Sequence, residues 1–236
     1  MGNRSPVKFG TDGWRGIIAD DFTFENVRVA ARAIAHYLLA SDDLHENPGK
    51  GVCVGYDTRF LSPQFAKAVA EVLAAAGIPV KLANHVTPTP ALSFAVRGLG
   101  AAGGVMITSS HNPYQWNGVK YKAWYGGSGK PSIMSAIESH LDQPLPLADK
   151  PASIEEVDFL PDYIDALKRF ADLDLIAKSG FRLAIDCMYG AGSGILAGIF
   201  KSIGVDYVEI RADQDPRFPG INPEPIEPHV RALEVA

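Results

Sequence analysis

Short apolar runs alternate with amphipathic stretches along almost the whole chain of 236 residues, and glycine and proline separate them. Strands that alternate with helices in this way build a layered α/β fold with a largely parallel sheet. The period of the apolar residues and the turn signals predict where each element lies. We expect strands at 51–59, 78–83, 102–110 and 119–124, and helices at 24–41, 63–76, 87–100 and 132–141, with Ser62 as the N-cap before Pro63.

Two of the expected strands end in strongly polar loops, YDTR (56–59) and TSSHNP (108–113). Ligands of parallel α/β sheets gather at the carboxyl edge of the strands, so both loops are expected to open on one edge. Asn117-Gly118 favours a tight hairpin turn, which would fold strand 119–124 back beside strand 102–108 and bring Lys120 near Ser110. On the residues alone, a plain polar turn and a solvated lysine stay open as alternatives.

Residues 142–157 carry three prolines and little apolar periodicity, which is typical of a linker. A second unit follows, with helices expected at 161–170 and 194–203 and strands at 181–187 and 206–211. We predict a first domain at 1–144, a linker at 145–157 and a second domain at 158–236. The second domain is expected to be truncated, because one strand–helix–strand unit offers too little sheet to bury both helical faces.

Charge and composition exclude several classes of function. The net charge is -5 and the Lys and Arg residues form no basic block, which argues against nucleic acid as a partner. No apolar run approaches the roughly 20 residues that cross a bilayer, and the N-terminus lacks the apolar core of a signal peptide, so we expect a cytoplasmic protein with no membrane partner. The two cysteines are expected to be buried thiols, and the six scattered histidines make a His/Cys metal site an unfavoured interpretation.

Two glycine-rich segments could approach an anion. In GTDGWRG (10–16), the glycines would let backbone amides contact a phosphate and Arg15 would supply a planar fork, although a simple N-terminal turn is equally consistent. DCMYGAGSG (186–194) lies between a strand and a helix, with Glu209 in the next strand, which suggests dinucleotide binding. The third glycine of that pattern is replaced by Ile195, so a loop that simply begins a helix is favoured.

Together, the segments FGTDGWRG, YDTR, TSSHNPYQWNGVK and FPGINPEP resemble the α-D-phosphohexomutases, the phosphoglucomutase and phosphomannomutase family. The resemblance runs in the same order from residue 7 to about residue 236. It implies a three-layer α/β/α domain with a mixed, mostly parallel sheet, followed by a second, truncated α/β/α domain. It also implies interconversion of hexose 1-phosphate and hexose 6-phosphate through a phosphoserine and a sugar 1,6-bisphosphate.

The resemblance assigns a role to each matching residue. Ser110 would carry the phosphoryl group, Lys120 would be the general acid and base, and Arg15 would steady the moving phosphate. His111 would act in the catalytic loop beside Ser110. The substrate- and phosphate-binding residues would be Thr11, Asn112, Asp57 and Arg59.

The family holds Mg²⁺ against the phosphoserine with a carboxylate loop of DGDxD type, and this sequence has none. We therefore expect Ser110 to contact one Mg²⁺ through its phosphate, with the carboxylate ligands beyond residue 236. Glucose 1,6-bisphosphate is the expected activator and a hexose phosphate the expected substrate. On this interpretation the chain is the N-terminal part of a longer enzyme, inactive without its C-terminal domains. A smaller departure is Ser109, where the family usually has alanine.

Two other functions stay open. One is a phosphoglucosamine mutase of the same family, although WRG and SSHNPYQW favour the glucose and mannose group. The other is a non-catalytic module that keeps the phosphomutase scaffold. The sugar and the oligomeric state are not determined by the sequence.

Overall fold

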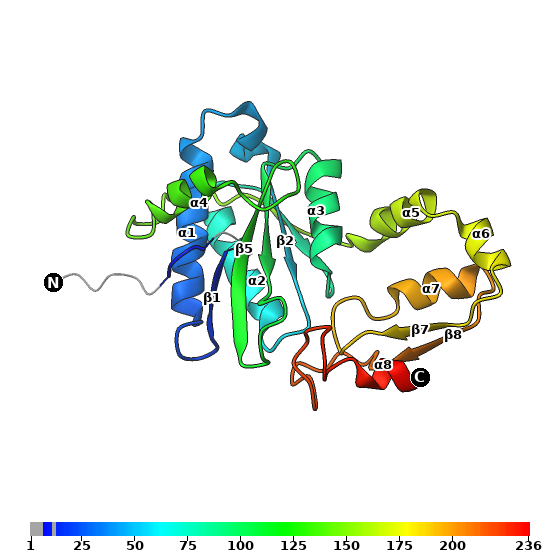
Figure 1. The fold of residues 1–236 in the computed structure, drawn as a ribbon. Helices are drawn as coiled ribbons and strands as arrows, with labels where there is room; N and C mark the ends of the chain where they lie inside the picture. Colours follow the sequence, from blue (N-terminus) through cyan, green and yellow to red (C-terminus); the bar gives the residue numbers. More distant parts are fainter. Residues whose placement is uncertain (1–6, 11–12) are drawn as a thin grey trace.

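The computed structural model describes residues 7–10 and 13–236. A larger N-terminal part contains a six-stranded sheet with helices on both faces, and a smaller C-terminal part contains a two-stranded sheet (Figure 1). Within the described residues, no helix combines the length and the apolar character needed to cross a membrane.

The large sheet is mixed and mostly parallel, as expected. Its strand order is β1-β5-β4-β2-β3-β6. The strands β2, β3, β4 and β6 run parallel to one another, whereas β5 runs antiparallel to both β4 and β1. The bounds are β1 Trp14–Ile17, β2 Val52–Tyr56, β3 Val80–Ala83, β4 Gly103–Ile107, β5 Trp116–Ala123 and β6 Ile154–Val157.

Helices cover both faces of this sheet (Figure 1). The connection from β2 to β3 crosses the sheet in one direction and the connection from β3 to β4 crosses back, so right-handed crossovers place their helices on opposite faces. This arrangement confirms the three-layer α/β/α fold. The helices are α1 Phe24–Ala40, α2 Ser62–Ala75, α3 Thr89–Gly98 and α4 Pro131–Glu138, with short 3₁₀ turns at Leu44–Glu46 and Pro48–Lys50.

The core lies between the sheet and these helices. All residues of β2 and β4 are buried, which explains their continuous apolar runs. The face of α1 predicted from its 3.6-residue period is fully buried as well. Its members are Val27, Ala31, Ile34, Ala35 and Leu38.

Asn117-Gly118 does not form the predicted hairpin turn, because both residues lie inside β5. The antiparallel pairing of β4 with β5 is nevertheless as expected, with Met106 opposite Lys120. The glycine is needed for strand packing: a Cβ on Gly118 would lie 2.6 Å from the carbonyl oxygen of Thr108 and 2.8 Å from that of Trp14. The chain reverses instead in the polar loop 108–115.

Two edge strands were missed by the sequence analysis. Residues 154–157, predicted as part of a linker, form β6 and pair with β3. Residues 14–17, inside the glycine-rich GTDGWRG segment, form β1 and pair with β5. Both strands are only four residues long, so a period-2 pattern has little room to develop.

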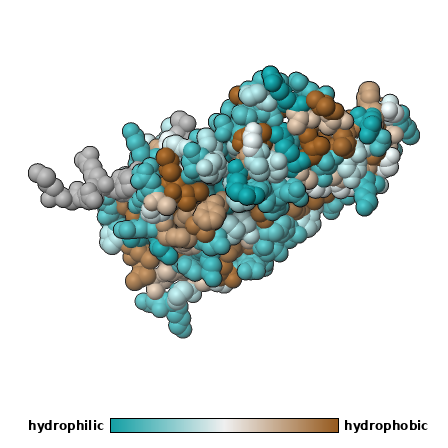
Figure 2. Space-filling view, turned by 90° about the horizontal axis from the view of Figure 1, so that it is seen from below, coloured by the Kyte–Doolittle hydropathy of each residue, from teal (hydrophilic) through white to brown (hydrophobic). Residues whose placement is uncertain are grey.

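The C-terminal part has few buried side chains. It contains α5 Leu160–Phe170, α6 Leu173–Lys178, β7 Leu183–Asp186, α7 Ile195–Ser202, β8 Tyr207–Ile210 and α8 Arg231–Val235. The strands β7 and β8 pair in parallel, and this sheet has no other strand in the described residues. Large apolar side chains such as Phe181 and Leu196 are exposed, and the space-filling view shows apolar patches over this part (Figure 2).

Replacing Gly118 with alanine is expected to lower the free energy of unfolding by about 1–3 kcal/mol, since the added methyl group would overlap backbone atoms on two neighbouring segments. Urea unfolding followed by circular dichroism measures the change. Gly98→Ala is the matched control, because its Cβ would meet nothing within 4 Å. The control should leave stability unchanged or raise it by up to about 1 kcal/mol. Equal effects of the two substitutions would contradict the packing described here.

Candidate functional site

The loop between β4 and β5 presents Ser110 to solvent at the carboxyl end of the buried strand β4. The backbone φ of Ser110 is +56°, in the left-handed region that residues other than glycine rarely adopt. Its N–H donates to Oγ1 of Thr108 at 3.0 Å, which stabilises this conformation. Strained backbone at an exposed hydroxyl is frequently found at functional sites.

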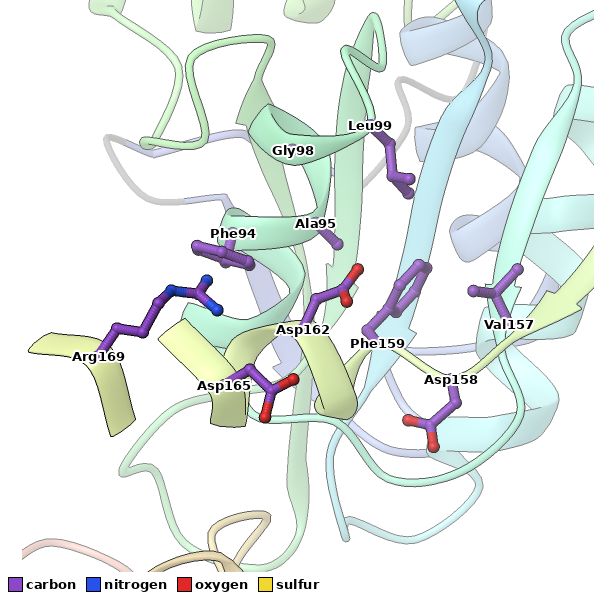
Figure 3. A pocket seen from close by; sticks show the side chains of 10 residues that line it. All are labelled: Phe94, Ala95, Gly98, Leu99, Val157, Asp158, Phe159, Asp162, Asp165 and Arg169. Atoms are coloured by element: carbon purple, nitrogen blue, oxygen red, sulfur yellow. The ribbon is translucent and has the colours of Figure 1, made fainter. Parts of the chain in front are cut away.

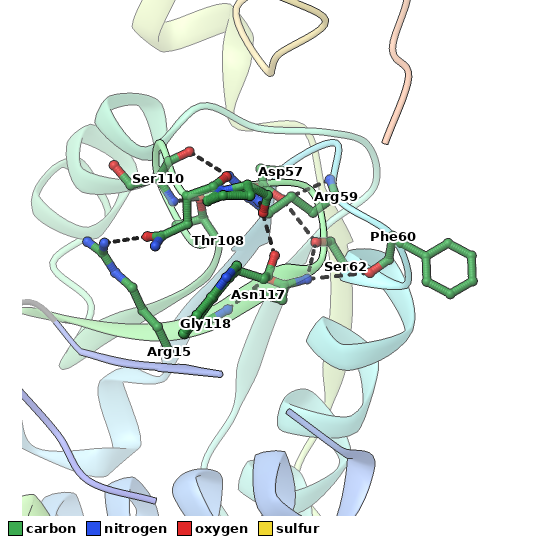
Figure 4. A network of polar contacts seen from close by, with 12 residues as sticks. Arg15, Asp57, Arg59, Phe60, Ser62, Thr108, Ser110, Asn117 and Gly118 are labelled. Carbon is green, nitrogen blue, oxygen red and sulfur yellow. Dashed lines mark hydrogen bonds and ion pairs between the residues drawn. The ribbon is translucent and has the colours of Figure 1, made fainter. Parts of the chain in front are cut away.

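A buried arginine holds the loop in place. Nη1 of Arg59 donates to the carbonyl oxygens of Pro113 and Trp116 at 2.9 and 3.0 Å. Nη2 donates to the carbonyl oxygens of Ser110 and Asn112 at 2.9 and 2.6 Å. The side chain of Arg59 is 0% exposed, so the guanidinium supports the loop from inside rather than facing solvent (Figure 4).

The partner of this cation is Asp57, which follows β2. Nε of Arg59 lies 3.3 Å from Oδ2 of Asp57, while Oδ1 accepts from the Arg59 amide at 3.0 Å. Burial raises the pKa of the Asp57 carboxyl and lowers the pKa of the Arg59 guanidinium, while the attraction between them opposes both shifts. Each ion therefore depends on the other for its charge. As predicted, the polar loops after β2 and β4 open on the same edge of the sheet.

Ser62 and Asn117 extend this network. Ser62 was predicted to cap α2, but the N-cap is Leu61, and Oγ of Ser62 donates instead to Oδ1 of Asp57 at 2.9 Å. Nδ2 of Asn117 donates to Oγ of Ser62 at 2.9 Å, and its Oδ1 accepts from the N–H of Gly118 at 2.8 Å. A buried carboxylate needs such donors more than the helix needs a side-chain cap.

Arg15 reaches the loop from β1. Its Nη1 donates to Oδ1 of Asn112 at 2.6 Å (Figure 4). The pairing of Arg15 with Gly118 in β5 sets this approach. Arg15 is half-buried, so its guanidinium lies at the edge of the site rather than inside the core.

Lys120 lies in β5 and is 6% exposed. It is directly opposite Met106, and residues paired in this way point to the same face of a sheet. Met106 lines the same cleft as Ser110. The register therefore places Lys120 on the same sheet face as Met106, although Lys120 is not among the residues that line the cleft, and its role stays a prediction.

The cleft has a volume of about 510 Å³ and lies between the two parts of the chain. The N-terminal part contributes Ser110, the exposed His111 and residues 88–90, which precede and begin α3. The C-terminal part contributes Asp186 and the glycine-rich loop after β7, together with Phe218. Such a volume is suited to a small molecule of sugar-phosphate size.

A second possible nucleophile in the cleft is Cys187, but its environment keeps it protonated. Burial and a hydrogen bond from its Sγ to Oε1 of Glu209 raise the pKa of the thiol from 9.0 to about 11. The same carboxylate oxygen accepts from the N–H of Gly194 at 3.0 Å. Glu209, the acidic residue of the dinucleotide pattern, thus lies in β8 and is hydrogen-bonded to the glycine-rich loop that follows β7.

Another hollow, of about 310 Å³, lies where α3 meets α5 (Figure 3). Phe94 and Phe159 supply apolar surface, and Asp162, Asp165 and Arg169 lie around it. Its lining contains no serine, cysteine, lysine or histidine among the described residues, and its titratable side chains are three aspartates and one arginine.

The described residues contain no group of three or more His, Cys, Asp or Glu side chains that could hold a metal ion. Of the carboxylates that line the cleft, Asp57 is paired with Arg59, and Asp186 accepts a hydrogen bond from Nε of Arg211 at 2.8 Å. These residues do not fit a complete magnesium site. The proposal that the carboxylate ligands lie beyond residue 236 stays a prediction.

The sequence matches two family models in succession. Residues 6–145 match phosphoglucomutase/phosphomannomutase α/β/α domain I, and residues 161–235 match α/β/α domain II. The chain belongs to the phosphoglucomutase/phosphomannomutase family. The family resemblance read from the sequence is therefore confirmed.

Relatives in the phosphohexomutase family cover nearly all of the chain. A "probable phosphoglucosamine mutase" of Methanothermobacter thermautotrophicus is 33% identical over 99% of this chain and 50% of its own length. The phosphoglucosamine mutase of Caldicellulosiruptor bescii is 32% identical over 96% of this chain and 49% of its own length. The chain thus spans about half the length of the curated relatives it matches.

A solved phosphohexomutase structure has the same fold. The crystal structure of a "putative phosphomannomutase" from Thermus thermophilus superimposes with a TM-score of 0.86 at 40% identity, covering 98% of this chain and 52% of that protein. The agreement over both parts supports the α/β/α architecture assigned above.

The candidate site contains most of the residues predicted for it. The structure brings Ser110, His111, Asn112 and Arg15 together at one loop, supported by Asp57 and Arg59. Thr11 lies outside the described residues. Ser109 is fully buried, so its hydroxyl does not compete with that of Ser110 at the surface.

Ser62, Thr108, Asn117 and Phe218 are among the residues of the site that were not predicted to belong to it. Ser62 was assigned to a helix cap and Asn117 to a hairpin turn. The sequence signal that could have identified them is the clustering of small polar residues beside buried strands, because a buried polar side chain needs hydrogen-bond partners. Phe218 belongs to the FPGINPEP segment, but nothing in its neighbours along the chain indicates that it reaches the serine loop.

Cys187 is expected to react with iodoacetamide about 100-fold more slowly at pH 7.5 than in the unfolded chain, because raising the thiol pKa from 9.0 to about 11 lowers the thiolate population by that factor. The rate should rise about tenfold per pH unit until the pH approaches 11. Peptide mass spectrometry after timed labelling measures it, with buried Cys53 as the internal control. Labelling at pH 7.5 as fast as in the unfolded chain would contradict the protonated state.

Proposed function

We propose that the chain carries the phosphoryl-transfer half of a phosphohexomutase site, with Ser110 as the phosphoryl carrier. The observation that carries the proposal is the position of Ser110: exposed, in a left-handed backbone conformation, at the mouth of a cleft and on a loop held by four hydrogen bonds from Arg59. Phosphoryl transfer depends mainly on positioning and charge stabilisation. A loop fixed in this way supplies the positioning.

The proposed step moves one phosphoryl group between two oxygens. The Oγ–P bond of phospho-Ser110 breaks while a P–O bond forms to a free hydroxyl of the hexose monophosphate. Lys120 accepts the proton of that hydroxyl and passes it to the departing Oγ of Ser110, while Arg15 stabilises the charge on the transferring group. The sugar bisphosphate then turns over, and its other phosphate returns to Ser110: Lys120 takes the proton of the Ser110 hydroxyl as the new Oγ–P bond forms and gives it to the sugar oxygen that is released.

The substrate class that we propose is a hexose phosphate. The curated relatives named above are called phosphoglucosamine mutases and the solved structure a "putative phosphomannomutase". Glucose and mannose phosphates remain our first candidates, because of the WRG and SSHNPYQW segments. The amino-sugar phosphate is the second candidate, which the names of the curated relatives favour.

Mg²⁺ and glucose 1,6-bisphosphate are the proposed metal and activator. A phosphoserine carries about -1.5 to -2 charges, which a divalent cation would neutralise. Ser110 is the residue of this chain that would contact the ion, through its phosphate. We further propose that the protein acts in the cytoplasm, with the C-terminal half found in its relatives as its structural partner.

A non-catalytic module with the same scaffold is the alternative. It would have no use for an exposed serine held in a costly backbone conformation, because an ordinary turn avoids that cost. The strained loop therefore favours the enzyme.

The test is phosphorylation by glucose 1,6-bisphosphate in the presence of Mg²⁺, read by intact-mass spectrometry on the 236-residue chain and on the longest natural form of the protein. We expect one added phosphoryl group in at least one of them. Ser110→Ala should abolish it, whereas Ser109→Ala should leave it unchanged because Ser109 is buried. No phosphoryl group in either form, or a group retained in Ser110→Ala, would contradict the proposal.

A further inference from the structure

An aromatic side chain of the C-terminal part contacts the serine loop network. The ring of Phe218 lies over the guanidinium of Arg59, with Cζ 5.2 Å from the ring centroid. Phe218 follows β8 by several residues and is 3% exposed. It also lines the cleft that contains Ser110.

The geometry suits a planar cation whose edges are already occupied. The donors of a guanidinium point outward in its plane, and in Arg59 they face four loop carbonyls and Asp57. The flat faces make no hydrogen bond, so an aromatic ring can cover one face without displacing any partner. A desolvated cation–π contact of this kind is favourable in addition to the apolar area that it buries.

The backbone around Phe218 is arranged to hold the ring there. The φ of Phe218 is +46°, an unusual conformation for a bulky residue. Turns fix it on both sides, since its N–H donates to the carbonyl oxygen of Asp215 and its carbonyl oxygen accepts from the N–H of Ile221, both at 3.1 Å. Such a conformation persists only when the surroundings determine it strongly.

A second aromatic contact joins the two parts. At the α3–α5 junction, the ring centroids of Phe94 and Tyr163 are 6.1 Å apart, beside the hollow of about 310 Å³. Near the serine loop, the C-terminal part contacts Arg59 through Phe218, and its Pro216 and Arg217 line a hollow together with Tyr114 and Gln115.

We propose that Phe218 is a positioning residue: by covering Arg59 it fixes the loop that presents Ser110, and so couples the placement of the C-terminal part to phosphoryl transfer. This inference rests on the proposed function of Ser110. Phe218 acts through Arg59 and takes no part in bond making. When the C-terminal part moves away from the cleft, Arg59 loses its cation–π contact with Phe218 and the loop becomes more mobile.

The first test measures loop order without any reaction. Hydrogen exchange of the 236-residue chain, read by mass spectrometry, should be roughly 2-fold to 30-fold faster at amides 110–116 in Phe218→Ala, the range given by the strength of a cation–π contact. Amides of β2 and β4 should keep their protection, which shows that the variant is folded. Phe218→Tyr keeps the aromatic ring, so amides 110–116 should still exchange slowly. Phe218→Leu keeps an apolar side chain but no ring, so its exchange rate should lie between those of Phe218→Tyr and Phe218→Ala.

The matched control is Phe200→Ala. Phe200 is a half-buried aromatic residue of the same part, whose ring centroid lies 6.4 Å from that of Tyr207. The control separates a specific effect on Arg59 from general loosening of the C-terminal part. Unchanged loop exchange in Phe218→Ala would overturn the inference, and so would an equal increase in Phe200→Ala.

The second test uses the phosphorylation of Ser110 in whichever form of the protein shows it. Phe218→Ala should lower the maximal rate of Ser110 phosphorylation. The half-saturating concentration of glucose 1,6-bisphosphate should change less. A change in the half-saturating concentration alone would indicate that Phe218 contacts the substrate directly, and would overturn the positioning role. If wild-type protein takes up no phosphate, the proposed function fails, while the exchange experiment still decides whether Phe218 orders the loop.

Discussion

The buried ion pair of Arg59 and Asp57 is the interaction on which the candidate site depends. Removing two charges from water is costly, and such a pair is stable only when its remaining donors and acceptors are satisfied. Here four loop carbonyls accept from the two Nη atoms of the guanidinium, and the Ser62 hydroxyl and the Arg59 amide donate to the carboxylate. The loop and the pair therefore stabilise each other. Loss of one partner of a buried pair commonly costs about 3–5 kcal/mol, so the loop conformation is strongly determined.

The sheet brings the pair and the loop together. Asp57 and Arg59 follow β2, and Ser110 follows the adjacent parallel strand β4, so both segments leave the sheet at the same edge. The antiparallel strand β5 then returns Lys120 to the same region. The arrangement explains how residues 51 positions apart, Arg59 and Ser110, come to share a hydrogen bond.

Much of this architecture could be predicted from the sequence, because buried strands and amphipathic helices leave a periodic pattern. The face of α1 and the shared edge of the two polar loops follow from local rules and were predicted correctly. The roles of Ser110 and Lys120 came from the family resemblance and stay predictions. Asn117-Gly118 was misread because its turn signal is local, whereas the close approach of Thr108 and Trp14 that requires the glycine is tertiary.

The remaining features depend on long-range contacts that no window of sequence contains. The strand β6 is defined by its pairing with β3, and its own residues are mostly exposed. The family resemblance assigned Arg59 to substrate and phosphate binding. Its buried position and its four carbonyl partners favour a supporting role. The cation–π contact of Phe218 with that arginine depends on where the C-terminal part lies.

The central claim is that the forked hydrogen bonds of Arg59, and not its charge alone, fix the loop that presents Ser110. The most direct measurement is ¹⁵N relaxation of the backbone amides in Arg59→Lys, which keeps a cation for Asp57 but cannot reach four carbonyls at once. In wild-type protein, order parameters at residues 110–116, apart from Pro113, should be about 0.85. In the variant they should fall below about 0.6, while β2 and β4 stay rigid. Loop order parameters that remain at the wild-type level in Arg59→Lys would contradict the account.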